Sequence, residues 1–501
     1  MIKLFSRDNF KFKSNWLSSW RPYFLIFALG FLLYSQTLFF DFTYFDDSTL
    51  VLENIEVLQD FKNVGQIFTT DAFFSDDKFY YRPFLTLSFM LDAQTGGVLP
   101  FFYHFSNILI HCLAAALLFR FLTRLSGRRP LSLFLSLIFL AHPVLTQAVA
   151  WIPGRNDSLL AIFVLGAFIA FFNFLDQPRL RSYLGYLVLF FCALLTKESA
   201  IVVPILVIFY FLFLEKGKLL NSDKWLLAGG SVAVGFVWFL LRAAALGGGS
   251  TDYMAAFIGI LKNSPAILLG LGKFVLPLNL SVLPILADST IIYGLIVLVI
   301  LVLVYFLSRG RRNNYAFFGA LWFFLFLLPS FIRLNTLPDF LEHRLYLPII
   351  GFIIILLEID WIKKLDFKKR LITIIALVLL LSFSALSFFH SANFRNRLVF
   401  WERAAADAPH SPLAQRNLGV MYYFAGRFDQ AEDYYFKALA LEPNEPMVHN
   451  NLGVIYLNKK DFVRAEAEFK KELEVNPGYD KALQNLRDLY QILNHQSGLS
   501  Q

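Results

Sequence analysis

Runs of apolar residues close to the length of a membrane-spanning helix recur along the chain between residues 20 and 390. A helix needs about 20 predominantly apolar residues to cross a bilayer, and a backbone in lipid must satisfy its own hydrogen bonds. The pattern therefore predicts an all-α, polytopic membrane domain over residues 1–390. The predicted spans are 21–40, 101–122, 131–150, 158–175, 183–195, 200–214, 225–246, 290–307, 315–332, 345–358 and 371–389.

After residue 390 the pattern changes to amphipathic helices with an internal repeat. Three elements recur at an offset of 34 residues: Asn417-Leu418-Gly419 as Asn451-Leu452-Gly453, Ala431 as Ala465, and Pro443 as Pro477. Small residues where paired helices touch, and a proline that ends each pair, are typical of tetratricopeptide repeats. Residues 391–501 are therefore predicted to form two such repeats and a capping helix.

Composition agrees with a membrane protein and narrows its chemistry. Hydrophobic residues make up 57% of the 501 residues, and the mean hydropathy is +0.57. The two cysteines, Cys112 and Cys192, both lie in apolar runs, so neither a disulfide framework nor a zinc site is predicted. The net charge is +8, but residues 391–501 hold 13 Lys/Arg against 14 Asp/Glu, so the positive excess lies in the membrane domain. No nucleic-acid partner is indicated.

The positive charges of the membrane domain predict its orientation, because Lys and Arg favour cytoplasmic connectors. They cluster in short connectors, namely Arg120 to Arg129, Arg179 and Arg181, Lys216 and Lys218, Arg309 to Arg312, and Lys363 to Arg370. The N-terminus is then cytoplasmic, and the first loop (41–100) and the repeats are extracytoplasmic. Residues 263–287 could be a span or a re-entrant piece; we treat them as non-crossing, because a crossing would move the Arg309 connector outside.

The first loop is acidic, with nine Asp/Glu and two Lys/Arg between Asp41 and Tyr81. Residues 64–74 are apolar at helical spacing, which predicts a short helix lying on the membrane interface. Farther along, two short spans meet at Thr196-Lys197-Glu198. Charges at such a joint favour a cavity that reaches into the bilayer.

Asp46 and Asp47 follow the first span directly and are candidate catalytic residues. Two carboxylates in close quarters hold one proton more tightly and can act as a general base on a hydroxyl acceptor. One alternative is that they only cap a helix that begins at Ser48. Another is that they hold a divalent cation, Mg²⁺ or Mn²⁺.

The other charged and histidine residues near the predicted spans are candidates because such groups are costly at membrane depth. The basic ones, which could hold a phosphate at the outer surface, are Arg82, Lys197, His343 and Arg344; the remaining candidates are His142, Arg155, Asp157, Glu198 and Glu342. Each basic residue could instead snorkel to the interface or form an internal ion pair, such as Lys197 with Glu198. His104 and His111 favour buried, hydrogen-bonded histidines over a metal site, since no further ligand is near them in sequence.

The order of these elements resembles the transmembrane and tetratricopeptide-repeat O-mannosyltransferase family, of the GT-C class of glycosyltransferases. The matching elements are Asp46-Asp47, Tyr81-Arg82-Pro83, Tyr103-His104 with Asn107 and His111, Ala141-His142-Pro143, Trp151 with Gly154-Arg155-Asn156-Asp157, Thr196-Lys197-Glu198, Glu342-His343-Arg344-Leu345-Tyr346-Leu347-Pro348, and the repeats. The small number of repeats differs from the animal members and fits a prokaryotic relative.

The resemblance implies an inverting transfer of a sugar, such as mannose, from a polyprenyl-phosphate carrier to a hydroxyl, such as that of protein Ser or Thr, on the extracytoplasmic face. It implies Asp46 with Asp47 as the base; the assignment of Arg82, Lys197, His343 and Arg344 to the carrier phosphate is ours, from charge. The repeats would hold the protein or peptide acceptor.

Two other functional classes compete with this hypothesis. A non-catalytic membrane-anchored scaffold would use its repeats to recruit partners, but so many spans exceed what an anchor needs. A transporter would use the intramembrane charges as an ion path, but transporters usually have internal symmetry, and residues 20–390 show none.

Overall fold

The computed structural model describes residues 16–74, 79–215, 217, 219–247, 253–332 and 340–498. It divides the chain into two compact units, which we describe separately. The membrane unit comprises Met1–Leu280, Thr290–Thr336 and Leu341–Arg395, and the repeat unit comprises Ser281–Ser289, Leu337–Phe340 and Asn396–Gln501.

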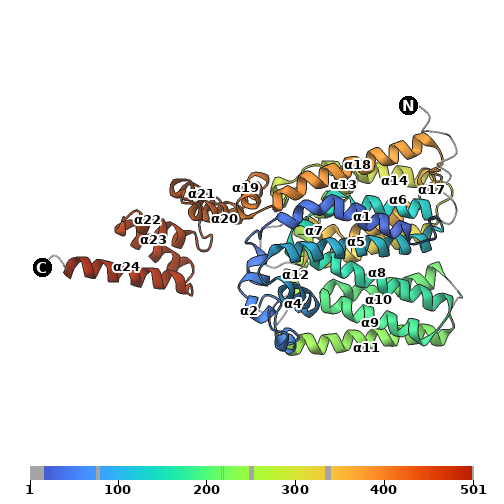
Figure 1. Cartoon of the computed structure of the whole chain (residues 1–501), viewed down its shortest axis with the longest axis horizontal. Helices are drawn as coiled ribbons and strands as arrows, with labels where there is room; N and C mark the ends of the chain where they lie inside the picture. Colours follow the sequence, from blue (N-terminus) through green and yellow to red (C-terminus); the bar gives the residue numbers. More distant parts are fainter. Residues whose placement is uncertain are drawn as a thin grey trace. The chain divides into compact units, whose positions relative to one another are not determined.

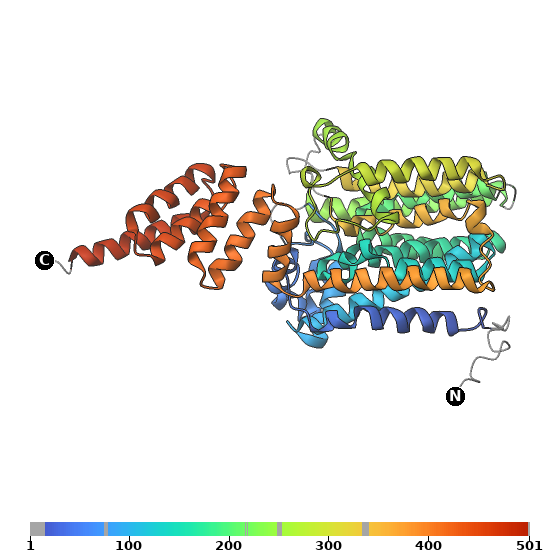
Figure 2. The same cartoon turned by 90° about the horizontal axis from the view of Figure 1, so that it is seen from above.

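Most of the long helices of the membrane unit lie side by side along one direction (Figures 1 and 2). The helices of this unit are α1 (Arg21–Tyr34), α2 (Ile55–Leu58), α3 (Val64–Ile67), α4 (Pro83–Gly96), α5 (Pro100–Ser126), α6 (Arg129–Leu140), α7 (Gln147–Ala150), α8 (Arg155–Asp176), α9 (Leu180–Thr196), α10 (Val203–Phe209), α11 (Asn221–Leu246), α12 (Tyr253–Asn263), α13 (Ala266–Val275), α14 (Ile292–Leu307), α15 (Asn313–Leu327), α16 (Pro348–Leu356), α17 (Asp360–Lys363) and α18 (Arg370–Ser391). The central helix α5 packs against α1, α6 and α8.

The predicted spans are helical in this structure. Among the described residues, seven helices are long and apolar enough to cross a membrane, or eight if a bent pair counts as one span. They are Arg21–Phe39, Pro100–Ser126, Ile152–Asp176, Asn221–Leu246, Met254–Val275, Asn313–Phe331 and Arg370–Phe394, and the bent pair is Arg129–Leu140 with Pro143–Ala150. Three predicted spans form shorter apolar helices, Leu180–Thr196, Glu198–Leu214 and Ile292–Leu307. The protein is therefore an integral membrane protein with an all-α fold.

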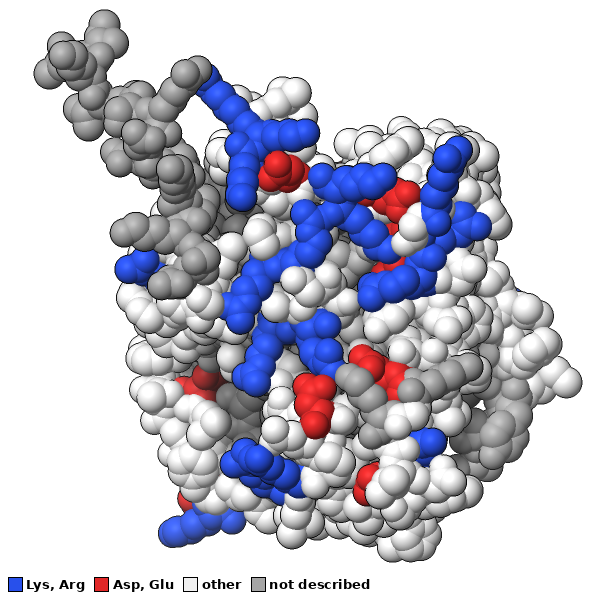
Figure 3. Space-filling view, turned by 90° about the vertical axis from the view of Figure 1, so that its right-hand side faces the viewer, with Lys and Arg blue, Asp and Glu red and all other residues white. Residues whose placement is uncertain are grey.

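The basic connectors meet at one end of the membrane unit. Arg124 pairs with Asp176 at 2.8 Å, Arg312 with Glu358 at 2.6 Å, and the Arg128 guanidinium donates to the Leu365 carbonyl at 2.8 Å. Figure 3 looks onto this end and shows Lys and Arg side chains spread across it. We call it the basic end. It is the end that the positive-inside rule assigns to the cytoplasm.

The segment around α12 and α13 enters and leaves the helical bundle at the end opposite the basic end. α11 begins shortly after Glu215, which lies 3.7 Å from Arg124, and α14 ends just before Arg309, whose backbone N–H donates to Asp360. The C-terminus of α11 and the N-terminus of α14 therefore lie at the end opposite the basic end. The helices α12 and α13 connect these two termini. The helix in the predicted span 345–358 is shorter than predicted, because α16 covers nine residues. The turn that begins at Glu342 extends this span toward the end opposite the basic end.

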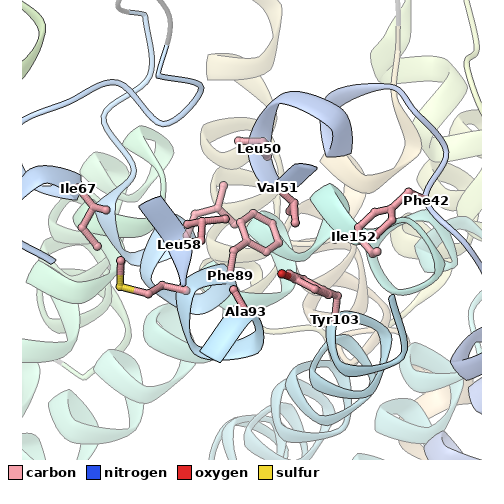
Figure 4. Packing of buried hydrophobic residues seen from close by; sticks show 11 residues of the cluster. Phe42, Leu50, Val51, Leu58, Ile67, Phe89, Ala93, Tyr103 and Ile152 are labelled. Carbon is pink, nitrogen blue, oxygen red and sulfur yellow. The ribbon is translucent and has the colours of Figure 1, made fainter. Parts of the chain in front are cut away.

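The first loop has its own hydrophobic core, which fixes it on the membrane helices. Figure 4 shows this cluster, formed by Phe42, Leu50, Val51, Leu58, Ile67, Leu85, Phe89, Met90, Ala93, Tyr103 and Ile152. The predicted helix at 64–74 is wrong in extent: α3 ends at Ile67, whose side chain is buried in this core, with Val64 and Phe68 packed against it. The acidic loop is thus a folded layer with a defined position.

The repeat unit consists of paired helices, α19 (Arg397–Asp407), α20 (Pro412–Phe424), α21 (Phe428–Leu441), α22 (Val448–Asn458), α23 (Phe462–Val475) and α24 (Asp480–Gly498). A Cβ at Gly419 would lie 2.7 Å from the Tyr435 ring, and one at Gly453 would lie 2.6 Å from the Phe469 ring. The glycines are therefore required where α20 meets α21 and α22 meets α23. This confirms the tetratricopeptide prediction.

Candidate active site

The two aspartates after the first span have different environments. Asp47 is fully buried, and its carboxylate accepts hydrogen bonds from the Thr43 amide at 2.6 Å, the Thr43 hydroxyl at 3.0 Å and the Phe45 amide at 2.9 Å. Burial raises the pKa of Asp47, against the effect of these hydrogen bonds. Asp46 is partly exposed. Asp47 therefore holds the turn together, and Asp46 is the member of the pair that a substrate can reach.

The capping alternative is wrong for Asp47. A helical segment does begin at Ser48 (η2, Ser48–Leu52), and Asp47 occupies its N-cap position. The Asp47 side chain makes no capping hydrogen bond, however, because it points back to the preceding turn. The Asp47 side chain closes the turn from Thr43 to Phe45, although its backbone lies at the start of the helical segment.

Trp151 joins the aspartate turn to the rest of the site. Its indole Nε1–H donates to Thr43 Oγ1 at 3.1 Å, and its ring stacks on Phe45 at a centroid distance of 5.8 Å. The indole ring also contacts the His343 ring, at a centroid distance of 5.5 Å. Trp151 lies just before η5 (Ile152–Gly154), where the bent α6–α7 pair gives way to α8. Two loops far apart in sequence therefore meet on one buried side chain.

Lys197 pairs with Asp157 and not with Glu198. Its Nζ lies 2.7 Å from Asp157 Oδ2, and both side chains are mostly buried. Lys197 is in an extended conformation before η6 (Glu198–Val202), so consecutive side chains point to opposite sides. The predicted internal pair of Lys197 with Glu198 is therefore wrong.

Arg82 takes the place of Lys197 as the partner of Glu198. The guanidinium lies 3.1 Å from Glu198 Oε2 and 4.3 Å from the centroid of the Tyr80 ring. The charge of Arg82 acts on the Lys197 ammonium group, and so does the charge of Arg344. Arg82 and Arg344, from two other segments, thus both lie within electrostatic range of Lys197, and cations of this kind can bind a phosphate together.

His343 connects this cationic group to the loop after α6. Its Nε2 lies 3.8 Å from Asp157 Oδ2, and its backbone N–H donates to Gln147 Oε1 at 3.0 Å. His343 and Arg344 lie on η10 (Glu342–Leu345), and both are buried. The structure therefore brings Arg82, Asp157, Lys197, Glu198 and the η10 residues to the same end as the aspartate turn.

Arg155 was predicted as a site candidate but fills a structural position. Its guanidinium donates to Asp92 Oδ2 at 2.6 Å, Asn107 Oδ1 at 2.6 Å, the Tyr103 carbonyl at 2.7 Å and Ser106 Oγ at 2.8 Å. The residue is completely buried. It ties α8 to α4 and α5 under the first loop, and its donors are used by the protein itself.

Glu342 and His142 belong to a second buried group beside the site. Glu342 Oε1 lies 2.5 Å from Lys273 Nζ on α13, and its Oε2 lies 3.7 Å from His390 at the end of α18. His142 Nδ1 accepts from the Val144 amide, and its Nε2 lies 3.1 Å from the Phe274 carbonyl, which fits the neutral tautomer with the proton on Nε2. These residues hold η10 against α13 and α18.

Sequence reasoning missed several residues of this arrangement, among them Thr43, Asp92, Gln147 and Lys273, and it did not predict the contacts of Trp151. Lys273 carried a usable signal, because it is a charge inside the apolar run 263–287. Of the two histidines on α5, His111 is hydrogen-bonded as predicted, to Tyr346 at 2.7 Å and the Leu140 carbonyl at 3.0 Å. His104 is buried edge-on against Phe40.

A divalent cation at Asp46 and Asp47 stays a prediction. Among the residues that the structure describes, no group of three His, Cys, Asp or Glu side chains could hold a metal ion. Both Asp47 oxygens already accept hydrogen bonds.

Comparison with known proteins finds family matches in both parts of the chain. Residues 89–249 match the family of dolichyl-phosphate-mannose-protein mannosyltransferases, a range that includes Trp151, Asp157 and Lys197. Residues 412–445 and 434–467 match tetratricopeptide repeat families.

The relatives are named as mannosyltransferases. The chain is 33% identical over 186 residues to Protein O-mannosyl-transferase TMTC2 of Mus musculus, which is 35% of this chain and 22% of the relative. It is 36% identical over 163 residues to TMTC1 of Mus musculus (30% and 17%), and 33% identical over 178 residues to Tmtc1 of Drosophila melanogaster (35% and 21%). The match thus spans about a fifth of the length of these relatives. Residues 89–249 are therefore similar to the dolichyl-phosphate-mannose-protein mannosyltransferases, tetratricopeptide repeats follow them, and the chain is similar to the protein O-mannosyl-transferases.

Proposed function

We propose that the protein is an inverting, GT-C-type membrane glycosyltransferase that transfers mannose from a polyprenyl-phosphate carrier to a hydroxyl of a protein acceptor. The observation that carries the proposal is the convergence of the aspartate turn and the cationic group. Trp151 contacts the turn at Thr43 and Phe45 and contacts His343, which lies beside Asp157 and Lys197.

The proposed reaction uses the two kinds of charge for opposite tasks. Asp46 accepts the proton of the acceptor hydroxyl while that oxygen attacks the anomeric carbon of the sugar. The bond between the anomeric carbon and the phosphate oxygen breaks on the opposite side, so the configuration inverts. The polyprenyl phosphate leaves with the electron pair, and Arg82, Lys197 and Arg344 stabilise its charge. Asp47 keeps the turn in place through its contacts with Thr43 and Phe45.

The charge distribution supports an assignment of the two ends of the membrane unit to the two sides of the membrane. The basic end contains the Arg and Lys connectors, which favour the cytoplasm. The aspartate turn and η10 lie at the other end, so the proposed reaction takes place on the extracytoplasmic face. The lipid tail of the carrier would lie among the apolar helices, and the repeats would bind the protein or peptide acceptor.

A transfer assay tests the function. The purified full chain, in detergent or in vesicles, is given a polyprenyl phosphate that carries radiolabelled mannose, together with a Ser/Thr-rich acceptor peptide. We expect label in the peptide, and loss of that label when Asp46 and Asp47 are both changed to Asn. A polyprenyl diphosphate carrying the same sugar serves as a donor of different charge.

The alternative is a membrane-anchored scaffold. It predicts no transfer by the wild-type chain and unchanged partner binding by the Asp46→Asn, Asp47→Asn variant. Absence of label in the peptide with every donor, in a preparation that still unfolds cooperatively, would overturn the enzyme proposal.

A further inference from the structure

The chain of contacts through Trp151 assigns this residue a specific task. We infer that Trp151 is a positioning residue that sets the place of the catalytic aspartate turn relative to the cationic group. The inference rests on the proposed function above, because it explains how acceptor activation and donor binding are held in register.

The connection on the acceptor side is a relay of two hydrogen bonds. The Trp151 Nε1–H donates to Thr43 Oγ1 at 3.1 Å, and the Thr43 hydroxyl donates in turn to Asp47 Oδ2 at 3.0 Å. A hydroxyl can accept one bond and donate another, so Thr43 satisfies both neighbours. Phe45, the residue before Asp46, stacks on the same indole at an interplanar angle of 19°. The turn is therefore held at Thr43, Phe45 and Asp47, on both sides of Asp46.

The connection on the donor side is a ring contact. The indole lies 5.5 Å from the His343 ring, and His343 Nε2 lies 3.8 Å from Asp157, the partner of Lys197. Trp151 is only 2% exposed, so the indole has no freedom to move away.

Rigidity matters here because transfer needs the acceptor oxygen and the anomeric carbon within about 3.5 Å of each other, and a misplacement near 1 Å can lower the rate by about a hundredfold. A side chain that joins the two halves of the site affects the chemical step more than the binding of either substrate. Loss of this connection should therefore lower kcat and leave the donor KM near its original value.

The experiment compares Trp151→Phe, Thr43→Val and the double variant in the full chain. Trp151→Phe removes the Nε1–H donor, and Thr43→Val removes the hydroxyl with little change of shape. Thr43→Ser keeps the hydroxyl and is the conservative rescue. Tyr186→Phe is the matched control, because it removes a buried hydrogen bond to Ser231 between α9 and α11.

We expect Trp151→Phe and Thr43→Val each to lower kcat by about tenfold or more, with the donor KM changed by less than about twofold. Their effects should not add in the double variant, because both remove the same relay. Thr43→Ser and Tyr186→Phe should retain most of the activity.

Hydrogen–deuterium exchange provides a readout that does not depend on transfer. The backbone amides of residues 41–50 should exchange faster in Trp151→Phe and Thr43→Val than in the wild type or in Tyr186→Phe. Equal exchange in all variants, additive losses of kcat, or a rise in donor KM alone would overturn the role of Trp151. If these two variants exchange faster at 41–50 but the wild type itself never transfers sugar, the proposed function is contradicted and the structural connection through Trp151 stands.

Discussion

The ammonium group of Lys197 lies 2.7 Å from Asp157, whereas the carboxylate of its chain neighbour Glu198 lies 3.1 Å from Arg82. Lys197 and Arg82 are therefore each partly balanced by one carboxylate before any substrate binds. A phosphate would join an existing ion-pair arrangement and share its cations with Asp157 and Glu198.

This arrangement predicts the effect of removing the Lys197 charge. Lys197→Met should raise the donor KM by about tenfold or more, because a hydrogen bond between charged groups at a desolvated site contributes about 1.5–3 kcal/mol. Steady-state transfer at varied donor concentration measures this. Lys262→Met, an exposed lysine on α12, is the control and should leave the donor KM unchanged. A normal donor KM in Lys197→Met would remove Lys197 from the phosphate site.

Arg155 should behave as a structural residue. Arg155→Met leaves Asp92 buried without its 2.6 Å partner, and breaking a buried ion pair on one side costs about 3–5 kcal/mol. We expect a lower melting temperature in detergent for this variant and an unchanged one for Arg179→Met, which changes an exposed residue of the basic end. Wild-type stability together with lost donor binding would show that Arg155 contacts the substrate.

Lys273 and Glu342 should be energetically coupled. Lys273→Met or Glu342→Gln alone leaves one buried charge without its partner. The loss of stability in the double variant should therefore be smaller than the sum of the losses in the two single variants. A double-mutant cycle on thermal unfolding measures the coupling. The control cycle combines Lys262→Met with Glu342→Gln. Strict additivity would mean that the 2.5 Å contact contributes nothing to the position of η10.

The repeat unit should lose stability in acid. Burial alone would raise the pKa of Glu468, but hydrogen bonds from His449 and Lys471 hold that pKa below its usual value. Such a carboxylate stabilises the fold above its unfolded-state pKa of about 4.3, and this contribution is lost as the pH falls through the lower folded value.

Calorimetry of the full chain checks this dependence. Glu468→Gln should lower the melting temperature of the repeat transition at pH 7 and weaken its fall below about pH 4.3. Glu474→Gln, at an exposed position of the same helix, should follow the wild type. An identical acid response in Glu468→Gln and the wild type would contradict the assignment.

The sequence predicted what depends on period and composition. The apolar runs predicted helices that the structure contains. The 34-residue offset of Gly419 and Gly453 predicted small residues at helix contacts, and in the structure these glycines lie against the rings of Tyr435 and Phe469. The basic connectors also predicted one common end. These features are local or repetitive, so a single chain reveals them.

Pairings across the fold could not be predicted in the same way. Lys197 and Glu198 are neighbours in the chain, but the extended backbone at Lys197 sends them to different partners. Asp46 and Asp47 look equivalent in sequence, and only the fold of the Thr43–Phe45 turn buries one and exposes the other. Arg155 looked like a site residue because its partners on α4 and α5 come together around it only in the folded protein.

The most direct test of the account is the rate of sugar transfer by Asp46→Asn with saturating donor. Asp60→Asn, which changes an exposed aspartate of the same loop, is the matched control. We predict that Asp46→Asn lowers kcat by about a hundredfold or more with donor binding retained, because a general base contributes about 10² to 10⁴ to a rate, and that Asp60→Asn transfers sugar like the wild type. Transfer by Asp46→Asn at the rate of Asp60→Asn would contradict the assignment of the catalytic base and, with it, the proposed mechanism.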